Sequence, residues 1–410
     1  SRTVTLPEVL RSAGMYTALV ADTPYPYFPE NGYQRGFDHV HIVRGQERDP
    51  FARVALPVTL PCNAEKLRDG DWAVTQYLRN VAVARRKVEE DYFSARTLRE
   101  AAAWLDKSHR RQPFFLFVDT FDPHEPWDPP KSYVDLYDPG YDGEEVIYPR
   151  YDRWRDFLSE RELKHCRALY AGEASMVDRW VGHLLDRIER LGLLDNTLVC
   201  FISDHGTYLG EHGYIGKAIL RDNQYESLPL YSEVCRLPWL LHFPGCSPGS
   251  KIDALVQPVN LAPTVLDFLG IQRPGTFAAP SLWHVLQGKE SKASEIAISS
   301  PTLSGKEMTQ PVPTNRCSIT DGRWLLIYGC AGTDEPRDES ACLESNQRLV
   351  APLAGVELSP ELYDLEADPG CNKNVITDHE DRARDLHRQF RGFLESSPMR
   401  REHLRFFQKI

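Results

Sequence analysis

Two short apolar runs, each following a long amphipathic segment, most restrict what this chain can fold into. One is PFFLFVDTF at 113–121, after a helical pattern over 95–108, and the other is NTLVCFISD at 196–204, after a helical pattern over 160–192. Because the positions in both runs are almost all apolar, each predicts a strand buried on both faces. Such strands, alternating with helices, are typical of a parallel sheet that helices cover on both sides.

Other segments extend this alternation. Residues 6–14 have the apolar spacing of an amphipathic helix that ends at Gly14, and the apolar run at 16–20 predicts a strand directly after it. A further strand is expected at 237–243 and a further helix at 262–270. We therefore expect an α/β protein in which a mostly parallel sheet is sandwiched between helices.

Toward the C-terminus the pattern changes. Short strand-like pieces with turn signals occur at 317–330 and 359–370, and a helical pattern follows at 381–395. This texture predicts a small C-terminal antiparallel α+β subdomain. We expect the division to fall between an α/β domain at 1–290 and this subdomain at 291–410.

Composition narrows the classes of function. With 41% hydrophobic residues, 410 residues are enough for one large domain and a smaller one. The net charge of −11 is spread over many short clusters, which argues against broad nucleic-acid binding. No window approaches the length of apolar sequence that a membrane span needs. We therefore expect a globular protein with neither a nucleic-acid partner nor a membrane partner.

The start of the chain and its cysteines are less informative. The sequence opens almost inside a helical pattern, without an initiator Met or a signal-peptide pattern, so we expect a truncated chain whose localisation cannot be read. The nine cysteines are an odd number and include no C-x-x-C pair, which predicts mostly reduced, buried thiols. A disulfide would be least surprising within one cluster, which comprises Cys317, Cys330, Cys342 and Cys371.

Two polar segments lie where buried strands are expected to end. One is DTFDPHEPWDPP at 119–130, and the other is SDHGTYLGEHGYIGK at 203–217. In an open α/β sheet, ligands gather at the carboxyl ends of the strands, so both segments are candidate parts of one site. Asp204 and His205 are adjacent there, and a carboxylate beside an imidazole suits a divalent cation. Two ligands alone hold a metal poorly, and the alternative is an aspartate that caps the next turn beside a solvent-facing histidine.

Four glycines and a lysine follow this pair. The glycines at positions 206, 210, 213 and 216 would let the backbone pass close to an anion, and Lys217 can offer that anion a positive charge. A cation together with a lysine describes a site for an anionic oxygen group.

Taken together, these segments resemble the sulfatase family. SDHGTYLGEHGYIGK is similar to the family's signature region, and FLFVDTFDPHEPWDPP at 115–130 is similar to the segment that carries a substrate-binding histidine. LPEVLRSAGMYTALV at 6–20 is similar to the helix and strand that follow the family's nucleophile. The later segments HFPG, VNLAPTVLDFLGI, GRWLLIY and ELYDLEADPG also occur in family order. The resemblance implies the α/β fold of the alkaline phosphatase superfamily.

The resemblance also implies roles for individual residues. Asp204 and His205 match a pair of metal ligands, and Lys217 matches the lysine that contacts the sulfate oxygens. His124 matches the histidine beside the bridging ester oxygen, where a general acid would protonate the leaving alkoxide. A structural hydrogen bond within a Pro-rich loop is the alternative for His124. His212 either binds substrate or holds its loop.

The chain departs from the family pattern in two places. The C/S-x-P-S/A-R signature, whose Cys or Ser becomes formylglycine, and its accompanying Asp-Asp pair do not occur, and we expect both in a missing N-terminal part. CSPGSK at Cys246 lacks the arginine and lies far from the nucleophile's usual place, so we reject it. In ALVADTPYPYF, Asp22, Thr23 and Pro24 stand where common arylsulfatases have a lysine and a histidine on the sulfate. Asp22 and Thr23 therefore either line the substrate pocket or belong to a repacked loop.

The function implied by the resemblance is metal-dependent hydrolysis of sulfate esters, of arylsulfatase type, with this fragment inactive by itself. Calcium is the expected metal, and the imidazole of His205 leaves manganese or zinc open. A phosphonate monoester or phosphodiester hydrolase of the same superfamily is one alternative, and a non-catalytic scaffold with the same fold is another. The expected partner is a small-molecule or carbohydrate sulfate ester. The sequence leaves a homo-oligomer open, and equally a cytoplasmic or periplasmic location.

Overall fold

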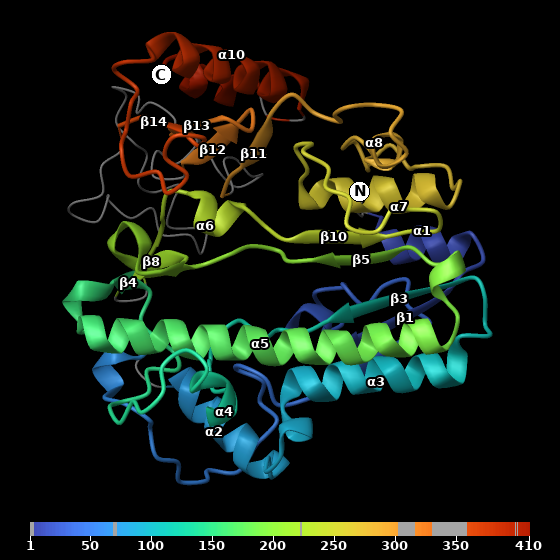
Figure 1. Ribbon diagram of the computed structural model, residues 1–410, viewed down its shortest axis with the longest axis vertical. Coiled ribbons are helices and arrows are strands. Elements are labelled where there is room, and N and C mark those ends of the chain that lie inside the picture. Colours follow the sequence, from blue (N-terminus) through green and yellow to red (C-terminus); the bar gives the residue numbers. More distant parts are fainter. Residues whose placement is uncertain are drawn as a thin grey trace.

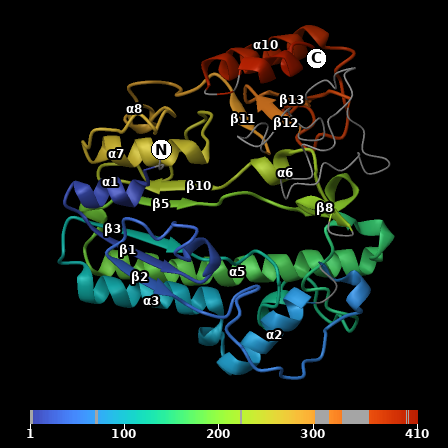
Figure 2. The same ribbon diagram turned by 180° about the vertical axis from the view of Figure 1, so that it is seen from behind.

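The structure is a computed structural model, and Figures 1 and 2 show it from opposite sides. Its described residues are 4–68, 72–221, 224–301, 316–329, 359–397, 399 and 401–410. A central layer of strands lies between two layers of helices, and the C-terminal elements form a separate group at one end (Figure 1).

The central parallel sheet consists of three strands in the order β2-β1-β3. They are β1 (Tyr16–Ala21), β2 (His39–Ile42) and β3 (Phe114–Asp119), and Figure 2 shows them side by side. The register places Ala21 opposite Asp119, so β1 and β3 end at the same edge of the sheet. The strands expected at 16–20 and 113–121 are thereby confirmed.

Helices cover both faces of this sheet. On one face lie α3 (Phe93–Ser108) and the 31-residue α5 (Glu160–Arg190), in a core where Trp104 and Leu105 pack with Ala18 of β1. The other face is covered by α1 (Leu6–Ser12) and α7 (Leu261–Phe268). Alternate residues of β3 point to opposite faces, which is why nearly every position in the strand must be apolar. The expected fold class is confirmed.

A second pair of strands completes the central layer. β5 (Val199–Ile202) pairs with β10 (Trp239–His242), and the pairing is antiparallel. The strand expected at 237–243 is therefore present but runs against its neighbour. Leu198, just before β5, shares a core with Phe115 of β3, so both strands belong to one packed layer.

Local sequence explains where the two best-capped helices begin. Thr5 and Glu8 form a capping box at the start of α1, and Ser159 and Glu162 form another at the start of α5. Gly14 follows α1 with φ of 90°, a conformation that glycine adopts at no steric cost. Among the described residues, no helix is both long and apolar enough to cross a membrane.

The α/β part of the chain also contains several short elements. The antiparallel strands are β4 (Asp152–Arg153), β6 (Tyr208–Leu209) and β7 (Tyr214–Gly216) in one sheet, and β8 (Ala218–Arg221) and β9 (Gln224–Ser227) in another. The remaining α-helices of this region are α2 (Trp72–Ala84), α4 (Lys131–Val134), α6 (Ser232–Cys235) and α8 (Trp283–Leu286). The 3-10 helices are η1 (Tyr25–Tyr27), η2 (Ala64–Lys66), η4 (Glu89–Asp91), η5 (Trp154–Asp156), η6 (Leu194–Asn196), η7 (Glu211–Gly213) and η8 (Pro258–Asn260).

The C-terminal elements form a four-stranded antiparallel sheet with a helix on one face. The strands are β11 (Ala297–Ser299), β12 (Cys317–Thr320), β13 (Trp324–Tyr328) and β14 (Glu361–Asp364), paired in that order. α10 (Glu380–Ser396) and η9 (Arg401–Phe407) pack against one face of this sheet. The opposite face packs on the segment around Tyr208 and Tyr231. The expected antiparallel subdomain is confirmed, whereas its boundary at residue 290 stays a prediction.

The described cysteines are all free thiols. Four of them are buried, among them Cys317 and Cys371, which the sequence placed in the cluster where a disulfide would be least surprising. The other two members of that cluster, Cys330 and Cys342, lie outside the described residues.

Candidate active site

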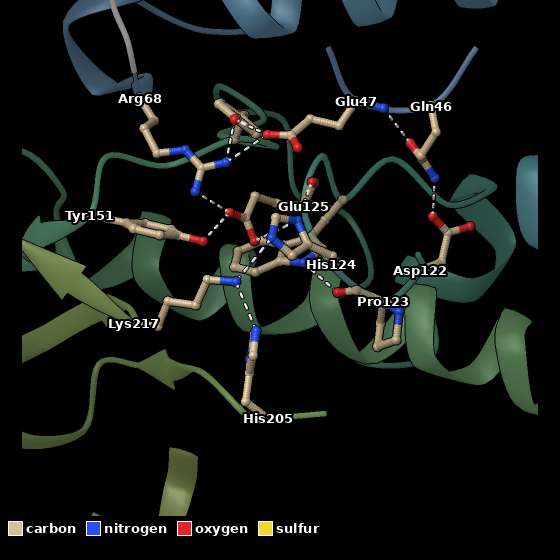
Figure 3. A network of polar contacts seen from close by, with 12 residues as sticks. Gln46, Glu47, Arg68, Asp122, Pro123, His124, Glu125, Tyr151, His205 and Lys217 are labelled. Atoms are coloured by element: carbon tan, nitrogen blue, oxygen red, sulfur yellow. Dashed lines mark hydrogen bonds and ion pairs between the residues drawn. The ribbon is translucent and has the colours of Figure 1, made fainter. Parts of the chain in front are cut away.

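Three segments converge at the carboxyl edge of the central layer. The loop after β3 carries His124, the loop after β5 carries Asp204 and His205, and Lys217 directly follows β7. The Nζ atom of Lys217 lies 3.2 Å from Nε2 of His124 and 3.0 Å from Nε2 of His205. Figure 3 shows the lysine reaching between the two imidazoles. The structure thus brings together four of the residues that the sequence predicted for one site.

Hydrogen bonds to backbone carbonyls define the state of both imidazoles. Nδ1 of His124 lies 2.7 Å from the carbonyl oxygen of Glu125, and Nδ1 of His205 lies 3.0 Å from that of Gly206. A carbonyl oxygen only accepts, so each Nδ1 carries a hydrogen. In the neutral ring, each Nε2 then has a lone pair, and both lone pairs face the Lys217 ammonium group.

Burial weakens the charge on both basic groups of this cluster. It lowers the pKa of Lys217, and Glu125 and Asp204 act against that shift. Burial also lowers the pKa of His124, and the Glu125 carboxylate opposes it most strongly. Lys217 and His124 therefore hold a positive charge less readily here than in water, in a cluster that also contains Glu125 and Asp204.

A buried charge network lies behind His124. Arg68 donates from one terminal nitrogen to Glu125 at 2.7 Å and from the other to Glu47 at 2.9 Å. Its guanidinium lies 4.1 Å from the ring centroids of both Tyr148 and Tyr151, and these two hydroxyls donate to Glu47 and Glu125 respectively. Burial would raise the pKa of Glu125, but His124, Arg68 and the Tyr151 hydroxyl outweigh it and lower the pKa to about 2. Glu125 is therefore a carboxylate at neutral pH.

Asp204 and His205 are suited to hold part of a metal shell. Oδ2 of Asp204 lies 3.4 Å from Nε2 of His205, and the Asp204 side chain is 83% exposed. The Nδ1 hydrogen bond to Gly206 leaves the Nε2 lone pair of His205 available, as metal-ligating histidines require. Since one lone pair cannot serve two partners, a cation on this nitrogen would replace Lys217. Within the described residues, no group of three or more histidine, cysteine, aspartate or glutamate side chains is placed to hold a metal ion.

Asp22 and Thr23 lie at the end of β1, and both are buried. The Asp22 carboxylate accepts from the backbone N–H of Phe121 at 2.7 Å and from the hydroxyls of Thr97 and Thr120 at 2.9 and 3.1 Å. These contacts hold the start of the loop that carries His124. The Thr23 hydroxyl is buried without a hydrogen-bond partner among the described residues. Substrate binding by either residue stays a prediction.

His212 lies apart from these contacts. Its ring stacks on Tyr231 at 3.8 Å between centroids, and its Nε2 lies 3.5 Å from a carboxylate oxygen of Glu233. Tyr231 belongs to the core beneath the C-terminal sheet. Of the two roles that the sequence left open, these contacts are those of a residue that holds its loop, and substrate binding stays untested.

Two of the signature glycines are required by protein packing. A Cβ atom on Gly206 would lie 2.0 Å from the carbonyl oxygen of Glu233, and one on Gly216 would lie 2.1 Å from the Tyr151 ring. Gly216 also has φ of 90°, in the region that favours glycine. These glycines let the chain pass close to Tyr151 and α6, and this path places Lys217 at the site. The sequence predicted close approach to an anion, and it did not reveal this packing requirement.

Sequence reasoning missed the network formed by Glu47, Arg68, Glu125 and their two tyrosines. The only local signal was the glutamate that directly follows His124 in HEPW. Glu47 and Arg68 come from loops before and after η2, and nothing in their spacing connects them with 119–130. Tyr25 and Tyr27, in the segment that departs from the family pattern, were also unassigned. The Tyr27 hydroxyl donates to Asp119 at the end of β3.

The fold and this site define an α/β protein that gathers a lysine, two histidines and an exposed aspartate at the carboxyl ends of its strands. Solved structures share the fold. A protein in complex with its substrate D-glucosamine-2-N,6-O-disulfate superposes with a TM-score of 0.63 at 18% identity, covering 100% of this chain and 84% of that one. The phosphonate monoester hydrolase of Agrobacterium radiobacter superposes with a TM-score of 0.65 at 17% identity, covering 97% of this chain and 81% of that one.

Sequence comparison names the family. The Sulfatase family model matches residues 1–271, and the chain belongs to the sulfatase family. An arylsulfatase of Clostridium perfringens is 27% identical over 212 residues, which are 47% of this chain and 41% of that protein. Arylsulfatase K of Xenopus laevis is 24% identical over 323 residues, which are 72% of this chain and 54% of that protein. The chain spans about half the length of these curated relatives.

Proposed function

We propose that this chain is part of a metal-dependent hydrolase of sulfate esters. The observation that carries the proposal is the placement of Lys217 between His124 and His205, beside Asp204, at the carboxyl edge of the sheet. A positive charge and a half-built cation site at one point favour an anionic, tetrahedral oxygen group. Membership of the sulfatase family supports the sulfate ester as that group.

The roles of the residues follow from their contacts. Lys217 stabilises the negative charge that develops on the sulfuryl oxygens during ester cleavage. His124 protonates the leaving oxygen, for which it must first be an imidazolium ion, because Nε2 of its neutral form has no hydrogen. The Glu125 carboxylate, 3.4 Å from Nδ1 of His124, favours that protonated form.

A divalent cation, held by Asp204 and His205, would supply Lewis-acid polarisation of an ester oxygen, and we expect calcium, with manganese or zinc as alternatives. Two ligands are fewer than such cations take in proteins. We propose that further ligands and a formylglycine nucleophile come from residues other than these 410, which would then be inactive by themselves. The substrate would be a small-molecule or carbohydrate sulfate ester.

The test separates metal binding from charge stabilisation in the complete protein. Asp204→Ala should abolish hydrolysis of 4-nitrophenyl sulfate and remove bound metal, whereas Lys217→Ala should lower kcat by about two to three orders of magnitude with the metal retained. Metal content is measured by elemental analysis of the purified proteins. Equal metal content in wild type and Asp204→Ala would contradict the ligand assignment. Faster cleavage of a phenyl phosphonate monoester than of the sulfate by wild type would instead favour the phosphonate alternative.

A further inference from the structure

The hairpin formed by β6 and β7 carries Lys217 to the site, since this lysine directly follows β7. At the tip of the hairpin, in η7, His212 has φ of 53° and ψ of 16°, in the left-handed region that residues other than glycine seldom adopt. Such a conformation persists only where the surrounding structure imposes it. The contacts of the hairpin therefore indicate what sets its position.

One tyrosine, Tyr231, contacts the hairpin at two points. Its ring stacks on that of His212 at the tip, with 3.8 Å between the centroids. Its backbone N–H donates to the hydroxyl of Tyr208 in β6 at 3.1 Å. Tyr208 is fully buried and pairs in register with Gly216, the residue before Lys217. The position of Tyr231 therefore determines the position of the strand end from which the lysine projects.

A glutamate of the C-terminal sheet, Glu361 in β14, holds the other end of the Tyr231 side chain. Its Oε2 atom accepts from the hydroxyls of Tyr231 and Tyr363, at 2.5 and 2.6 Å. Its Oε1 atom accepts from Arg316 at 2.6 Å, and the side chains of Arg316 and Glu361 are only 2% and 14% exposed. Hydrogen bonds to a charged partner are stronger than neutral ones, and burial strengthens them further. Glu361 therefore fixes the hydroxyl end of the Tyr231 ring.

The segment 229–235, which contains Tyr231, also supports the loop of His205. The N–H of Gly206, directly after His205, donates to the carbonyl oxygen of Val234 at 2.9 Å. One face of the C-terminal sheet packs on this segment. In both views, α6 at the end of the segment lies between the C-terminal sheet and the central layer (Figures 1 and 2). Both the lysine and the histidine of the site thus depend on a segment that the C-terminal sheet holds.

We propose that Glu361 is a positioning residue for the hydrolysis: through Tyr231 it holds the β6–β7 hairpin so that the ammonium group of Lys217 keeps its place in the site. The inference rests on the proposed function, in which Lys217 stabilises charge on the sulfuryl oxygens. Such stabilisation depends on a charge that is in place before the reaction begins, and a small displacement of it lowers kcat. The C-terminal sheet therefore contributes to catalysis although it lies far from the site in sequence.

The test removes single hydroxyl groups from this route in the complete protein. Tyr231→Phe deletes the hydroxyl that Glu361 holds and keeps the ring that stacks on His212. Tyr363→Phe is the matched control, because it deletes a hydroxyl from the same carboxylate oxygen, on β14 instead of beside the hairpin. Both are also made in the Lys217→Ala background, which shows whether an effect passes through the lysine. We measure kcat and KM for 4-nitrophenyl sulfate, and urea denaturation establishes that each variant is folded in the assay.

Tyr231→Phe should lower kcat by about 3-fold to 30-fold, the range for loss of one hydrogen bond, and should leave KM within about twofold. Tyr363→Phe should change kcat by less than about twofold. In the Lys217→Ala background, Tyr231→Phe should also change kcat by less than about twofold, because the charge that it positions is gone. If Tyr231→Phe is unfolded in the assay, Glu361→Gln, which weakens the same hydrogen bond, should show the same loss and the same dependence on Lys217.

An equal loss of kcat in both tyrosine variants would mean that the C-terminal sheet only stabilises the fold. The same factor of loss in the Lys217→Ala background, a loss confined to KM, or no loss at all would likewise overturn the inference. Each of these results leaves the proposed function intact. Undiminished hydrolysis by Lys217→Ala alone would instead overturn the proposed function itself.

Discussion

Replacing Arg68 by methionine is the most direct test of the charge network behind His124. The guanidinium is 7% exposed and forms ion pairs with Glu47 and Glu125, which are 6% and 3% exposed. Methionine has a similar length but no charge. The substitution therefore leaves two buried carboxylates without their common cation.

The expected cost is large because the remaining charges stay desolvated. Removing one partner of a buried ion pair typically lowers the free energy of unfolding by about 3–5 kcal/mol. Arg68 also lies 4.1 Å from each of the Tyr148 and Tyr151 rings, and a desolvated cation–π contact contributes about 2 kcal/mol. These contributions overlap, so we expect a loss of about 3–5 kcal/mol in total.

The dependence on pH provides a second signature. The wild-type pKa of Glu125 is lowered to about 2, so its stabilising contribution is complete above the unfolded-state pKa and is lost as pH falls toward 2. Without Arg68, less charge opposes the effect of burial, so the pKa of Glu125 rises. As the pH falls, Glu125 of the variant becomes protonated, and the cost of its unpaired buried charge disappears. The difference in stability between wild type and variant should be greatest above about pH 5 and shrink below about pH 4.

Urea denaturation of both proteins at several pH values measures these differences. Arg384→Met is the matched control, since Arg384 forms an exposed ion pair with Glu380 on α10 and its loss should cost less than about 0.5 kcal/mol. A cost below about 1 kcal/mol for Arg68→Met at pH 7, or a cost independent of pH, would refute the assigned role of the network.

Two further predictions concern the loop after β3. His124→Ala should lower kcat/KM for alkyl sulfates, whose leaving groups need a proton, by about one to two orders of magnitude more than for 4-nitrophenyl sulfate; a uniform loss across leaving groups would mean that His124 only binds the sulfate. Asp22→Ala should lower the free energy of unfolding by about 1–3 kcal/mol, because it leaves the N–H of Phe121 without its partner, and should leave KM within about twofold. Unchanged stability with a raised KM would contradict this structural role and favour substrate binding by Asp22.

The strands and helices of the central layer were predictable because a buried position requires an apolar residue, and the spacing of apolar residues differs between strands and helices. β3 contacts helices on both faces, so its continuous apolar run predicts both that it is a strand and that it is buried on both sides. The direction of β10 relative to β5 could not be predicted in this way. An antiparallel partner of β5 and a parallel one need the same apolar side chains, and only long-range pairing distinguishes them.

Part of the site was predictable from chemistry at strand ends. Asp204, His205 and Lys217 are close in sequence, and His124 follows a strand whose carboxyl end had to lie at the same edge. The state of the two imidazoles was not predictable, because it depends on which atoms their Nδ1 hydrogens reach. His212 lies in the same motif, yet the chain turns it toward Tyr231.

The sequence by itself determined the alternation of elements, the cation and anion chemistry at the strand ends and, through its motifs, the family. Only the tertiary structure decided which charges meet. Arg68 and Glu125 are 57 positions apart and Gln46 and Asp122 are 76 apart, and no local pattern relates them. Their pairing depends on burial, since a charge removed from water must find a partner within hydrogen-bonding distance, and it is the fold that determines which partners lie within that distance.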